Sequence, residues 1–507
     1  MKSNDLAIIE KLHPSIECPG PSPIEVKKLK QYLKSYISFS LGMWFRAGIS
    51  FLSVPVISYL IIPEEFGKSA MFTMTFSVIT GFMFLGTDQS FMRFFNEYRE
   101  EERRRLFWAC LSPSFVVTTC VSFILLIFGK QVSLLLYGRV YPNINLLLSI
   151  TLYLVLLQRF NQSLVRMRKK GFLYSLIDSV NAVGNFAFTL IYALFVERSF
   201  IAIVFGNMMG YVLALFTGIY FGREYWKPAR YSFSEVRAVL KFGLPFVPNL
   251  LLAWLFTSMD RISLRRYSTM TEIGLYSTAF KIVSVMNLFQ TGFSLLWMPT
   301  AYERYESDRG DTVFFKKAFE MICFVVFSVG FLVVGFKDVI FLLLARSYRP
   351  SAQIAPFLIL VPIMQLLWLV SGLGIDLTKK TYWHMVISSA AALLNFVGNT
   401  LLVPLYGARG AAISTGLSYV LYFYMRTFIS ERLFPVGYDI KRASAGILMM
   451  IVASSIGTLG TDLSLNVSVG MVGLCAVVCL YKKEFASLRK EVLSFVRTRR
   501  QNSKPSA

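Results

Sequence analysis

The chain is poor in the residues from which metal centres and disulfide frameworks are built. Its 507 residues include only six cysteines and two histidines. Five cysteines fall within apolar runs and Cys18 lies near the N-terminus, a spacing that fits neither disulfide pairs nor zinc ligands. His13 and His384 stand far apart. We therefore expect no metal site, no bound cofactor and no catalytic residue.

Charge is also scarce. Charged residues make up only 16% of the sequence, hydrophobic residues make up 55%, and mean hydropathy is +0.56. These values lie outside the range of soluble chains of this length and predict an integral membrane protein. The basic excess, 52 residues against 29 acidic ones, lies in short clusters beside apolar runs without a nucleic-acid recognition module. Nucleic-acid binding is therefore not expected.

Fourteen apolar runs are long enough to cross a hydrocarbon layer about 30 Å thick as helices. The runs are Ile37–Ile62, Ser69–Thr87, Phe107–Phe128, Ile144–Leu164, Phe172–Val196, Phe200–Phe221, Phe242–Met259, Ile273–Thr300, Ala318–Phe336, Ile354–Gly374, Tyr382–Val403, Ala408–Ile429, Ala443–Leu459 and Leu463–Leu480. If both tails and the even-numbered loops share one side, that side holds 39 of the 52 basic residues. The positive-inside rule then places both tails in the cytoplasm.

The first twelve runs contain an internal repeat. At an offset of 210 residues, Lys169-Lys170 recurs as Lys379-Lys380, Ile177 as Ile387, Ser179 as Ser389, Asn185 as Asn395 and Gly206 as Gly416. Phe66-Gly67 and Ile273-Gly274 match at an offset of 207. Chance similarity is the alternative, because apolar segments use few residue types, but the constant spacing argues against it. Six helices per repeat would relate the halves by an axis along the membrane normal.

These patterns predict an all-α polytopic membrane protein with about 14 transmembrane helices, arranged as two six-helix lobes plus two appended helices. The expected divisions are a cytoplasmic tail with an amphipathic segment (1–36), the N-lobe (37–221), a cytoplasmic connector (222–241), the C-lobe (242–429), helices 13 and 14 (443–480) and a basic cytoplasmic tail (481–507). Apolar residues at helical spacing in 24–36 and 485–495 predict helices on the inner membrane face.

Two cations, Arg46 and Lys281, interrupt apolar runs near their middle. Arg46 lies nine residues past the start of its run at Ile37, and Lys281 lies nine residues past Glu272. At 1.5 Å per residue, each is about 14 Å deep. A charge in hydrocarbon costs between about 3 and 10 kcal/mol. Each side chain could snorkel or cap a helix carbonyl, but that is difficult from mid-membrane. We favour a site for an anionic cargo between the repeats.

Further charges end two of the runs. Asp88 and Arg93 end the second run, and Asp260 and Arg261 end the seventh. Taken singly, each pair is typical of an interfacial salt bridge. Taken together, Arg93 and Arg261 would add positive charge to the rim of a cavity suited to phosphate oxygens. The acids Asp88, Asp260 and Asp178 are candidates for coupling to a proton or sodium gradient.

Three stretches resemble the polysaccharide and O-antigen flippases of the multidrug/oligosaccharidyl-lipid/polysaccharide exporter superfamily. The middle of the chain contains Lys241-Phe-Gly-Leu-Pro-Phe-Val-Pro248, Met259-Asp-Arg-Ile-Ser-Leu264 and Ile273-Gly-Leu-Tyr-Ser-Thr-Ala-Phe-Lys-Ile282. The beginning contains Tyr59-Leu-Ile-Ile-Pro-Glu-Glu-Phe-Gly67, Leu85-Gly-Thr-Asp88 and Arg93-Phe-Phe-Asn-Glu97. The third stretch runs from Asn395 through Pro404-Leu-Tyr-Gly-Ala-Arg-Gly-Ala-Ala412. The resemblance runs from about Tyr36 to Leu480.

The resemblance implies a transporter, not an enzyme, in the plasma (inner) membrane of a prokaryote. Such proteins move an undecaprenyl-diphosphate-linked oligosaccharide to the outer leaflet by alternating access, for surface polysaccharide biosynthesis. Arg46 and Lys281 would neutralise the diphosphate, while the aromatic residues Tyr32, Tyr36, Trp44 and Tyr276 either stack on sugars or pack and anchor the helices. Expected partners are the lipid-linked oligosaccharide, membrane lipids, and the polysaccharide polymerase with its chain-length machinery.

Three alternatives remain. A multidrug exporter of the same superfamily should carry an acid deep in its cavity, because its cargo is usually cationic, whereas this chain carries cations. A lipid II flippase would share the fold and differ only in substrate. A membrane-embedded polymerase or glycosyltransferase would need a large extramembrane loop with catalytic residues, and all connectors here are short.

Overall fold

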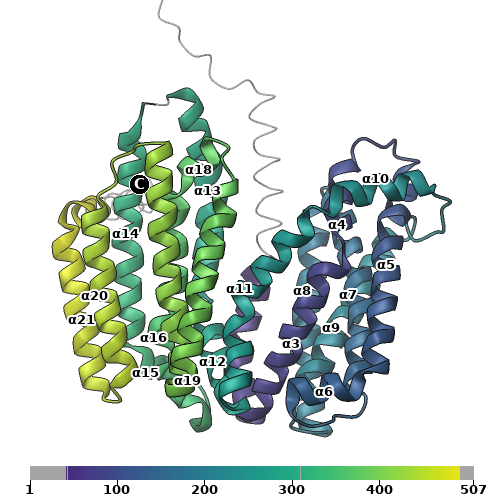
Figure 1. Cartoon of the computed structure of the whole chain (residues 1–507), viewed down its shortest axis with the longest axis horizontal. Coiled ribbons are helices and arrows are strands. Elements are labelled where there is room, and N and C mark those ends of the chain that lie inside the picture. The colour runs from purple at the N-terminus through teal and green to yellow at the C-terminus, as the bar shows by residue number, and fades with distance from the viewer. Residues whose placement is uncertain (1–41, 43, 309, 491–507) are drawn as a thin grey trace, which may run out of the picture.

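The computed structural model describes residues 42, 44–308 and 310–490, and all regular secondary structure in this part of the chain is helical. The amphipathic segment expected at 24–36 lies outside the described residues, as do residues 491–495 of the one expected at 485–495. The rest forms two helical bundles side by side (Figure 1). The expected all-α fold is confirmed.

The first bundle begins with a short apolar helix, Trp44–Leu60. It continues with α3 (Pro63–Met83), α4 (Thr87–Phe94), α5 (Arg103–Ile127), α6 (Gly129–Tyr137), α7 (Ile144–Met167), α8 (Gly171–Phe195) and α9 (Phe200–Gly222). Its elements occupy the right-hand side of Figure 1. Arg159 lies inside α7, which continues past the predicted end of its run at Leu164 to Met167.

A short helix and a long one connect the bundles. Ser232 caps α10 (Phe233–Gly243) by accepting a hydrogen bond from the Glu235 backbone, while the Glu235 side chain accepts one from the Ser232 backbone. This capping box satisfies two N–H groups that a helix start leaves unpaired. Helix α11 (Phe246–Tyr267) then runs from the α10 end of the molecule toward the opposite end, between the two bundles (Figure 1).

The second bundle contains all the remaining described helices. They are α12 (Met270–Val283), α13 (Met286–Ser307), α14 (Thr312–Gly335), α15 (Lys337–Phe341), η1 (Arg346–Gln353), α16 (Ala355–Leu358), α17 (Leu360–Ser371), α18 (Leu373–Leu377), α19 (Tyr382–Leu433), α20 (Ile440–Leu459) and α21 (Leu463–Leu480). Helix α19 is two helices joined at Gly407, whose φ of 55° is a left-handed conformation that glycine adopts easily. The break falls between the eleventh and twelfth predicted spans.

By length and composition, nine of the described helices are able to cross a membrane, or up to eleven if each bent pair is one span. Each of the fourteen predicted runs overlaps a described helix. The lower count arises because Trp44–Leu60 is short, α11 carries several charges, and α19 is counted once despite its break. The chain is a multi-pass membrane protein, and the number fourteen stays a prediction.

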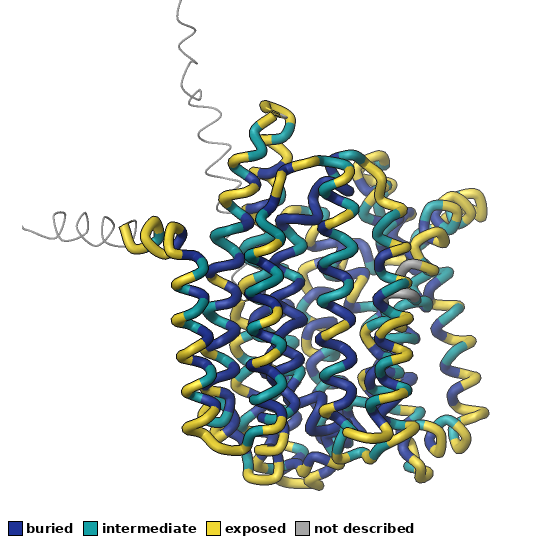
Figure 2. Tube along the Cα trace, turned by 60° about the vertical axis from the view of Figure 1, so that its left-hand side comes forward, coloured by how far each residue is buried: buried dark blue, intermediate teal, exposed yellow. Residues whose placement is uncertain are grey.

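Burial follows the bundle arrangement. Buried residues concentrate where helices of one bundle face each other, and exposed positions mark the helix ends and outward faces (Figure 2). Many outward positions are large and apolar, such as Phe172, Phe195 and Leu405, each at least 74% exposed. An apolar outer surface of this extent is what a bilayer, rather than water, would cover.

The bundles touch at the end that carries α6 and diverge toward the end that carries α10 (Figure 1). At the touching end, the Tyr348 hydroxyl donates a hydrogen bond of 2.7 Å to the Ile61 carbonyl, and the Ala345 N–H donates one of 3.0 Å to Ser58. Arg265 at the end of α11 donates to the Leu136 carbonyl of α6 at 2.8 Å. The molecule is therefore closed between the bundles at the α6 end.

The repeat is visible in the backbone. Lys169 and Lys379, which the sequence paired at an offset of 210, both have positive φ, at 57° and 61°. Each precedes the helix whose asparagine, Asn185 or Asn395, is matched in the repeat. Few residues other than glycine adopt positive φ, so a shared occurrence at matched positions supports the repeat.

Candidate functional site: a polar cavity between the bundles

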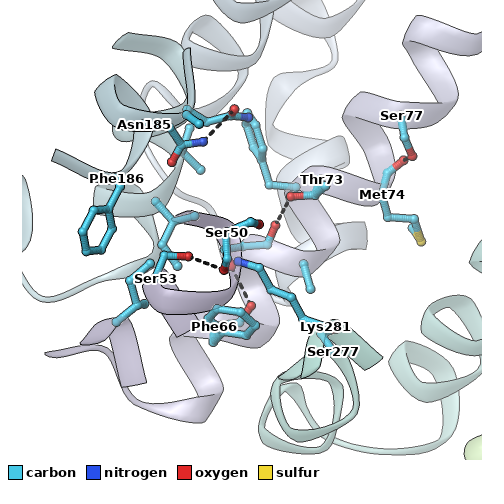
Figure 3. A pocket seen from close by; sticks show the side chains of 18 of the residues that line it. Ser50, Ser53, Phe66, Thr73, Met74, Ser77, Asn185, Phe186, Ser277 and Lys281 are labelled. Atoms are coloured by element: carbon cyan, nitrogen blue, oxygen red, sulfur yellow. Dashed lines mark hydrogen bonds between the residues drawn. The ribbon is translucent and has the colours of Figure 1, made fainter. Parts of the chain in front are cut away.

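A cavity of about 410 Å³ lies between the two bundles. Its walls come from the first helix, α3, α8 and α9 on one side and from α11 and α12 on the other. This volume falls within the usual range of ligand pockets. Figure 3 shows Lys281 reaching from α12 toward the helix that carries Ser50 and Ser53.

The two cations singled out in the sequence line this same cavity. Arg46 contributes from the first helix and Lys281 from α12, and both also line a neighbouring pocket of about 290 Å³. Arg46 Nη1 lies 3.1 Å from Asp178 Oδ1 of α8, which makes an ion pair. The Arg46 side chain is 59% exposed in spite of this contact. The structure therefore leaves most of the guanidinium open to the cavity.

Lys281 and Arg261 supply further positive charge. Both line the 410 Å³ cavity, and within the described part of the chain neither has an acidic partner. The Lys281 ammonium lies 5.9 Å from the centroid of the Phe66 ring, which offers only a weak cation–π contact. The buried Arg261 Nε makes no hydrogen bond to any described residue. Two cations without counter-ions leave the cavity electropositive.

The remaining polar wall was not anticipated from the sequence. Asn181, Asn185 and Asn207 line the cavity together with Tyr211. Asn185 Nδ2 donates a hydrogen bond of 3.2 Å to Asn207 Oδ1. A usable sequence pattern exists, because Asn181 and Asn185 are four residues apart on α8, and Asn207 and Tyr211 are four apart on α9. That spacing puts each pair on one helix face.

Asp260 lies elsewhere, inside the second bundle. The residue is 4% exposed, and its carboxylate accepts hydrogen bonds from Asn399 Nδ2 at 2.8 Å, Asn395 Nδ2 at 3.2 Å and Thr415 Oγ1 at 2.7 Å. The Tyr276 hydroxyl donates to it as well. Asp260 therefore does not pair with its neighbour Arg261, contrary to the expected interfacial salt bridge. Four donors from α12 and α19 surround one buried acid.

Asp88 and Arg93 likewise have different partners from those expected. Asp88 is buried and accepts bonds from Arg159 Nη2 at 3.0 Å and Nε at 3.2 Å. Arg93 pairs with Glu97, one turn further along the chain. Neither Asp88 nor Arg93 is part of the cavity wall. The bend of 49° between α3 and α4 separates this segment from the cavity-lining part of α3.

The aromatic residues proposed for sugar stacking are not gathered on the cavity wall. Tyr276 is 1% exposed and packs inside the second bundle against Asp260, so it cannot stack on a cargo. Trp44 is 45% exposed at the beginning of the first helix. Tyr32 and Tyr36 lie outside the described residues. Within the described residues, no three His, Cys, Asp or Glu side chains are placed to hold a metal ion.

Comparison with known proteins assigns the family. A sequence profile described as "Polysaccharide biosynthesis protein" matches residues 32–303, which is more than half of the chain. The chain belongs to this polysaccharide biosynthesis family. The matched region contains the first bundle, α10, α11 and α12, and therefore Arg46, Arg261 and Lys281. A search of curated proteins gives no match.

Two solved structures share the fold of this family member. A lipid II flippase MurJ in an inward closed conformation superposes with a TM-score of 0.67 and 14% sequence identity, covering 89% of this chain and 100% of that one. A multidrug resistance MATE family transporter of the MOP superfamily, in an inward-facing conformation, gives a TM-score of 0.55 at 12% identity, with 82% and 99% covered. At these identities the likeness establishes the fold alone.

Proposed function

We propose that this protein is a flippase that moves a polyprenyl-diphosphate-linked oligosaccharide across the plasma membrane by alternating access. The observation that carries the proposal is the placement of Arg46, Arg261 and Lys281 on facing walls of one cavity between the two bundles. Membership of a polysaccharide biosynthesis family supports a carbohydrate-bearing cargo. The fold shared with two transporters supports transport over an enzymatic reaction.

The cargo explains why cations are retained at this depth. A diphosphate carries negative charge that hydrocarbon does not solvate, and a hydrated sugar chain would lose its hydrogen bonds there. Charge-assisted hydrogen bonds from a guanidinium and an ammonium replace the lost water at the phosphate oxygens. The sugars then occupy the polar cavity, while the prenyl chain stays in the lipid outside the bundles.

The closed α6 end suggests which state is observed. If the basic side of the chain faces the cytoplasm, the α10 end is cytoplasmic and the cavity opens inward. Within the basic segment Arg103-Arg104-Arg105, Arg105 pairs with Glu235 of α10 at 3.4 Å, which places this segment at the α10 end. The protein would therefore be poised to take up cargo from the cytoplasmic leaflet of a prokaryotic inner membrane. The polymerase and its chain-length machinery would receive the cargo on the other side.

Asp260 is the acid best placed to couple transport to a proton or sodium gradient. Asp178 already neutralises Arg46, and Asp88 already pairs with Arg159. Asp260 has no basic partner among the described residues and is held by neutral donors from α12 and α19. Binding a proton or cation there would reorganise these helices, one of which, α12, carries Lys281. The coupling acid and the cargo cation would then share one helix.

The same site argues against a multidrug exporter of this fold. A cationic drug would meet Lys281 and Arg261, which have no counter-ions among the described residues, and like charges repel strongly where water is scarce. A lipid II flippase stays an alternative, because lipid II also bears a diphosphate. The family match favours a polysaccharide precursor over lipid II.

The test uses single substitutions in the native host. Arg46→Ala and Lys281→Ala should abolish surface polysaccharide while its lipid-linked precursor accumulates inside the cell. Lys316→Ala is the matched control, because Lys316 is an exposed cation at the start of α14 outside the cavity. Membrane levels of each variant are measured by immunoblot. Normal surface polymer from both cavity variants would reject the proposed function.

A further inference from the structure

One wall of the cavity is built from neutral amides. Helices α8 and α9 pack so closely that a Cβ atom on Gly206 would lie 2.0 Å from Thr189 Oγ1, and one on Gly210 would lie 2.7 Å from the Asn181 carbonyl oxygen. Only glycine permits this approach. The close packing brings Asn185 and Asn207 within hydrogen-bond distance, and Figure 3 shows Asn185 at the cavity opposite Lys281.

This wall, formed by Asn181, Asn185, Asn207 and Tyr211, is termed the amide patch. Its hydrogen-bonding capacity is largely unused. The bond between Asn185 and Asn207 occupies one N–H of the first and the oxygen of the second, and Asn185 Oδ1 accepts one long bond of 3.5 Å from Thr189 Oγ1. Asn181 makes no side-chain hydrogen bond to any described residue. Each amide offers two donors and a two-lone-pair acceptor, which together can replace the water around a polar group that enters the cavity. The patch is therefore suited to a polar ligand.

In the second bundle, the asparagine that matches Asn185 in the repeat has its hydrogen bonds made by neighbouring side chains. Asn395 is the repeat equivalent of Asn185, at the offset of 210 residues. Its Nδ2 donates to both Asp260 and Thr415 at 3.2 Å, and the residue is 1% exposed. Asn185 instead borders the cavity. Only the first bundle therefore presents its repeat asparagine to a ligand.

We propose that the amide patch binds the hydroxyl and acetamido groups of the sugar next to the diphosphate. This inference rests on the proposed function, because it assumes that the cations hold the diphosphate in the same cavity. Sugar hydroxyls and acetamido groups both donate and accept hydrogen bonds, as asparagine amides do, whereas phosphate oxygens prefer the cations. The cavity is thus divided into a cationic part for the diphosphate and a neutral part for the first sugar.

The experiment compares two lipids on the purified full chain in detergent. One probe is a polyprenyl diphosphate, and the other is the same lipid carrying a single N-acetylglucosamine. We expect the unmodified protein to bind the sugar-bearing probe about tenfold more tightly, as two hydrogen bonds would give. Asn181→Leu combined with Asn207→Leu should remove this difference and leave binding of the bare diphosphate lipid unchanged.

Three further variants separate recognition from structure. Asn181→Leu alone should remove part of the preference without breaking any internal hydrogen bond, since Asn181 has none among the described residues. Val183→Leu, on the outward face of α8, is the matched control and should behave like the unmodified protein. Arg46→Gln should weaken the binding of both probes by the same factor.

The possible failures are distinguishable. Equal affinities of the unmodified protein for the two probes would overturn the sugar site and leave the diphosphate site standing. Weaker binding of both probes in the double asparagine variant would also overturn it, because the amides would then serve structure alone. If the unmodified protein binds neither probe, the proposed function is rejected, and with it the amide patch as a sugar site.

Discussion

Gly67 of α3 and Gly274 of α12 cross backbone against backbone where the two bundles meet. A Cβ atom on Gly67 would lie 1.9 Å from the Met270 carbonyl oxygen, and one on Gly274 would lie 1.9 Å from the Pro63 carbonyl oxygen. The two glycines are repeat equivalents, at an offset of 207 residues. A symmetric contact between equivalent positions is expected on the axis that relates the lobes. This crossing closes the α6 end of the cavity.

Gly67→Val should favour the conformation in which the α6 end is open. The added side chain overlaps a carbonyl oxygen, and overpacking of this kind costs about 1–3 kcal/mol, which shifts a two-state equilibrium by about 5-fold to 150-fold. Distances between spin labels on α6 and α15 would report the shift. Gly48→Val is the control, because a Cβ on Gly48 meets nothing within 4 Å. An unchanged distance distribution in Gly67→Val would contradict this role of the crossing.

Asp178→Asn should strengthen binding of a diphosphate lipid. The substitution removes the counter-ion of Arg46 and one negative charge that repels the cargo. Because Arg46 is largely exposed, the ion pair is worth at most about 1 kcal/mol, so the expected gain is up to about fivefold in affinity. Asp88→Asn, whose carboxylate pairs with Arg159 away from the cavity, should leave the affinity unchanged. Weaker binding in Asp178→Asn would show that Asp178 positions Arg46 for the cargo.

Asp260→Leu should destabilise the second bundle strongly. It leaves the buried donors of Asn395, Asn399 and Thr415 without their acceptor, at a cost of about 3–5 kcal/mol in the free energy of unfolding. Asp260→Asn keeps one acceptor oxygen and should lower the free energy of unfolding by a smaller amount. Thermal unfolding in detergent measures both. Equal losses in the two variants would mean that the charge, and not the hydrogen-bond network, stabilises this region.

Asp376, in α18 outside the spans, should make stability depend on acid pH. Burial alone would raise the pKa of Asp376, but the hydrogen bond from His384 and the charge of Arg426 hold it below its ordinary value of 3.8. A carboxyl group with a lowered folded-state pKa contributes stability that is complete above the ordinary value and is lost as the pH falls through the folded-state pKa.

The check is Asp376→Asn, followed by thermal unfolding between pH 7 and pH 3. The variant should be less stable by about 1–3 kcal/mol at pH 7, and its deficit should shrink as the pH approaches 3. Glu303→Gln, at an exposed acid on α13, should show little effect at any pH. A deficit that stays constant across this range would indicate that the carboxylate charge of Asp376 contributes nothing.

Much of the architecture followed from local sequence properties. Each of the fourteen apolar runs overlaps a described helix, because the requirement for about 20 apolar residues acts on the chain locally. The repeat offsets of 210 and 207 correctly paired Lys169 with Lys379 in backbone conformation and Gly67 with Gly274 at the bundle contact. The depth of Arg46 and Lys281 placed them at one level, and both line one cavity.

The site was predictable only in part. Side-chain partners depend on which helix faces become neighbours, and the spacing of Asp88, Arg93, Asp260 and Arg261 carried no information about that. Asp88 therefore pairs with Arg159 and not with Arg93. Asp260 accepts hydrogen bonds from two asparagines and Thr415 instead of pairing with Arg261.

The sequence by itself determined the membrane location, the helices, the repeat and the two deep cations, because hydropathy, length and charge along the chain settle these. Tertiary structure decided which charges face the cavity, which acids are neutralised, and that amides from α8 and α9 complete its wall. The reason is physical. Insertion into a bilayer is governed by each segment's own composition, whereas a cavity exists only after helices distant in sequence have packed against each other.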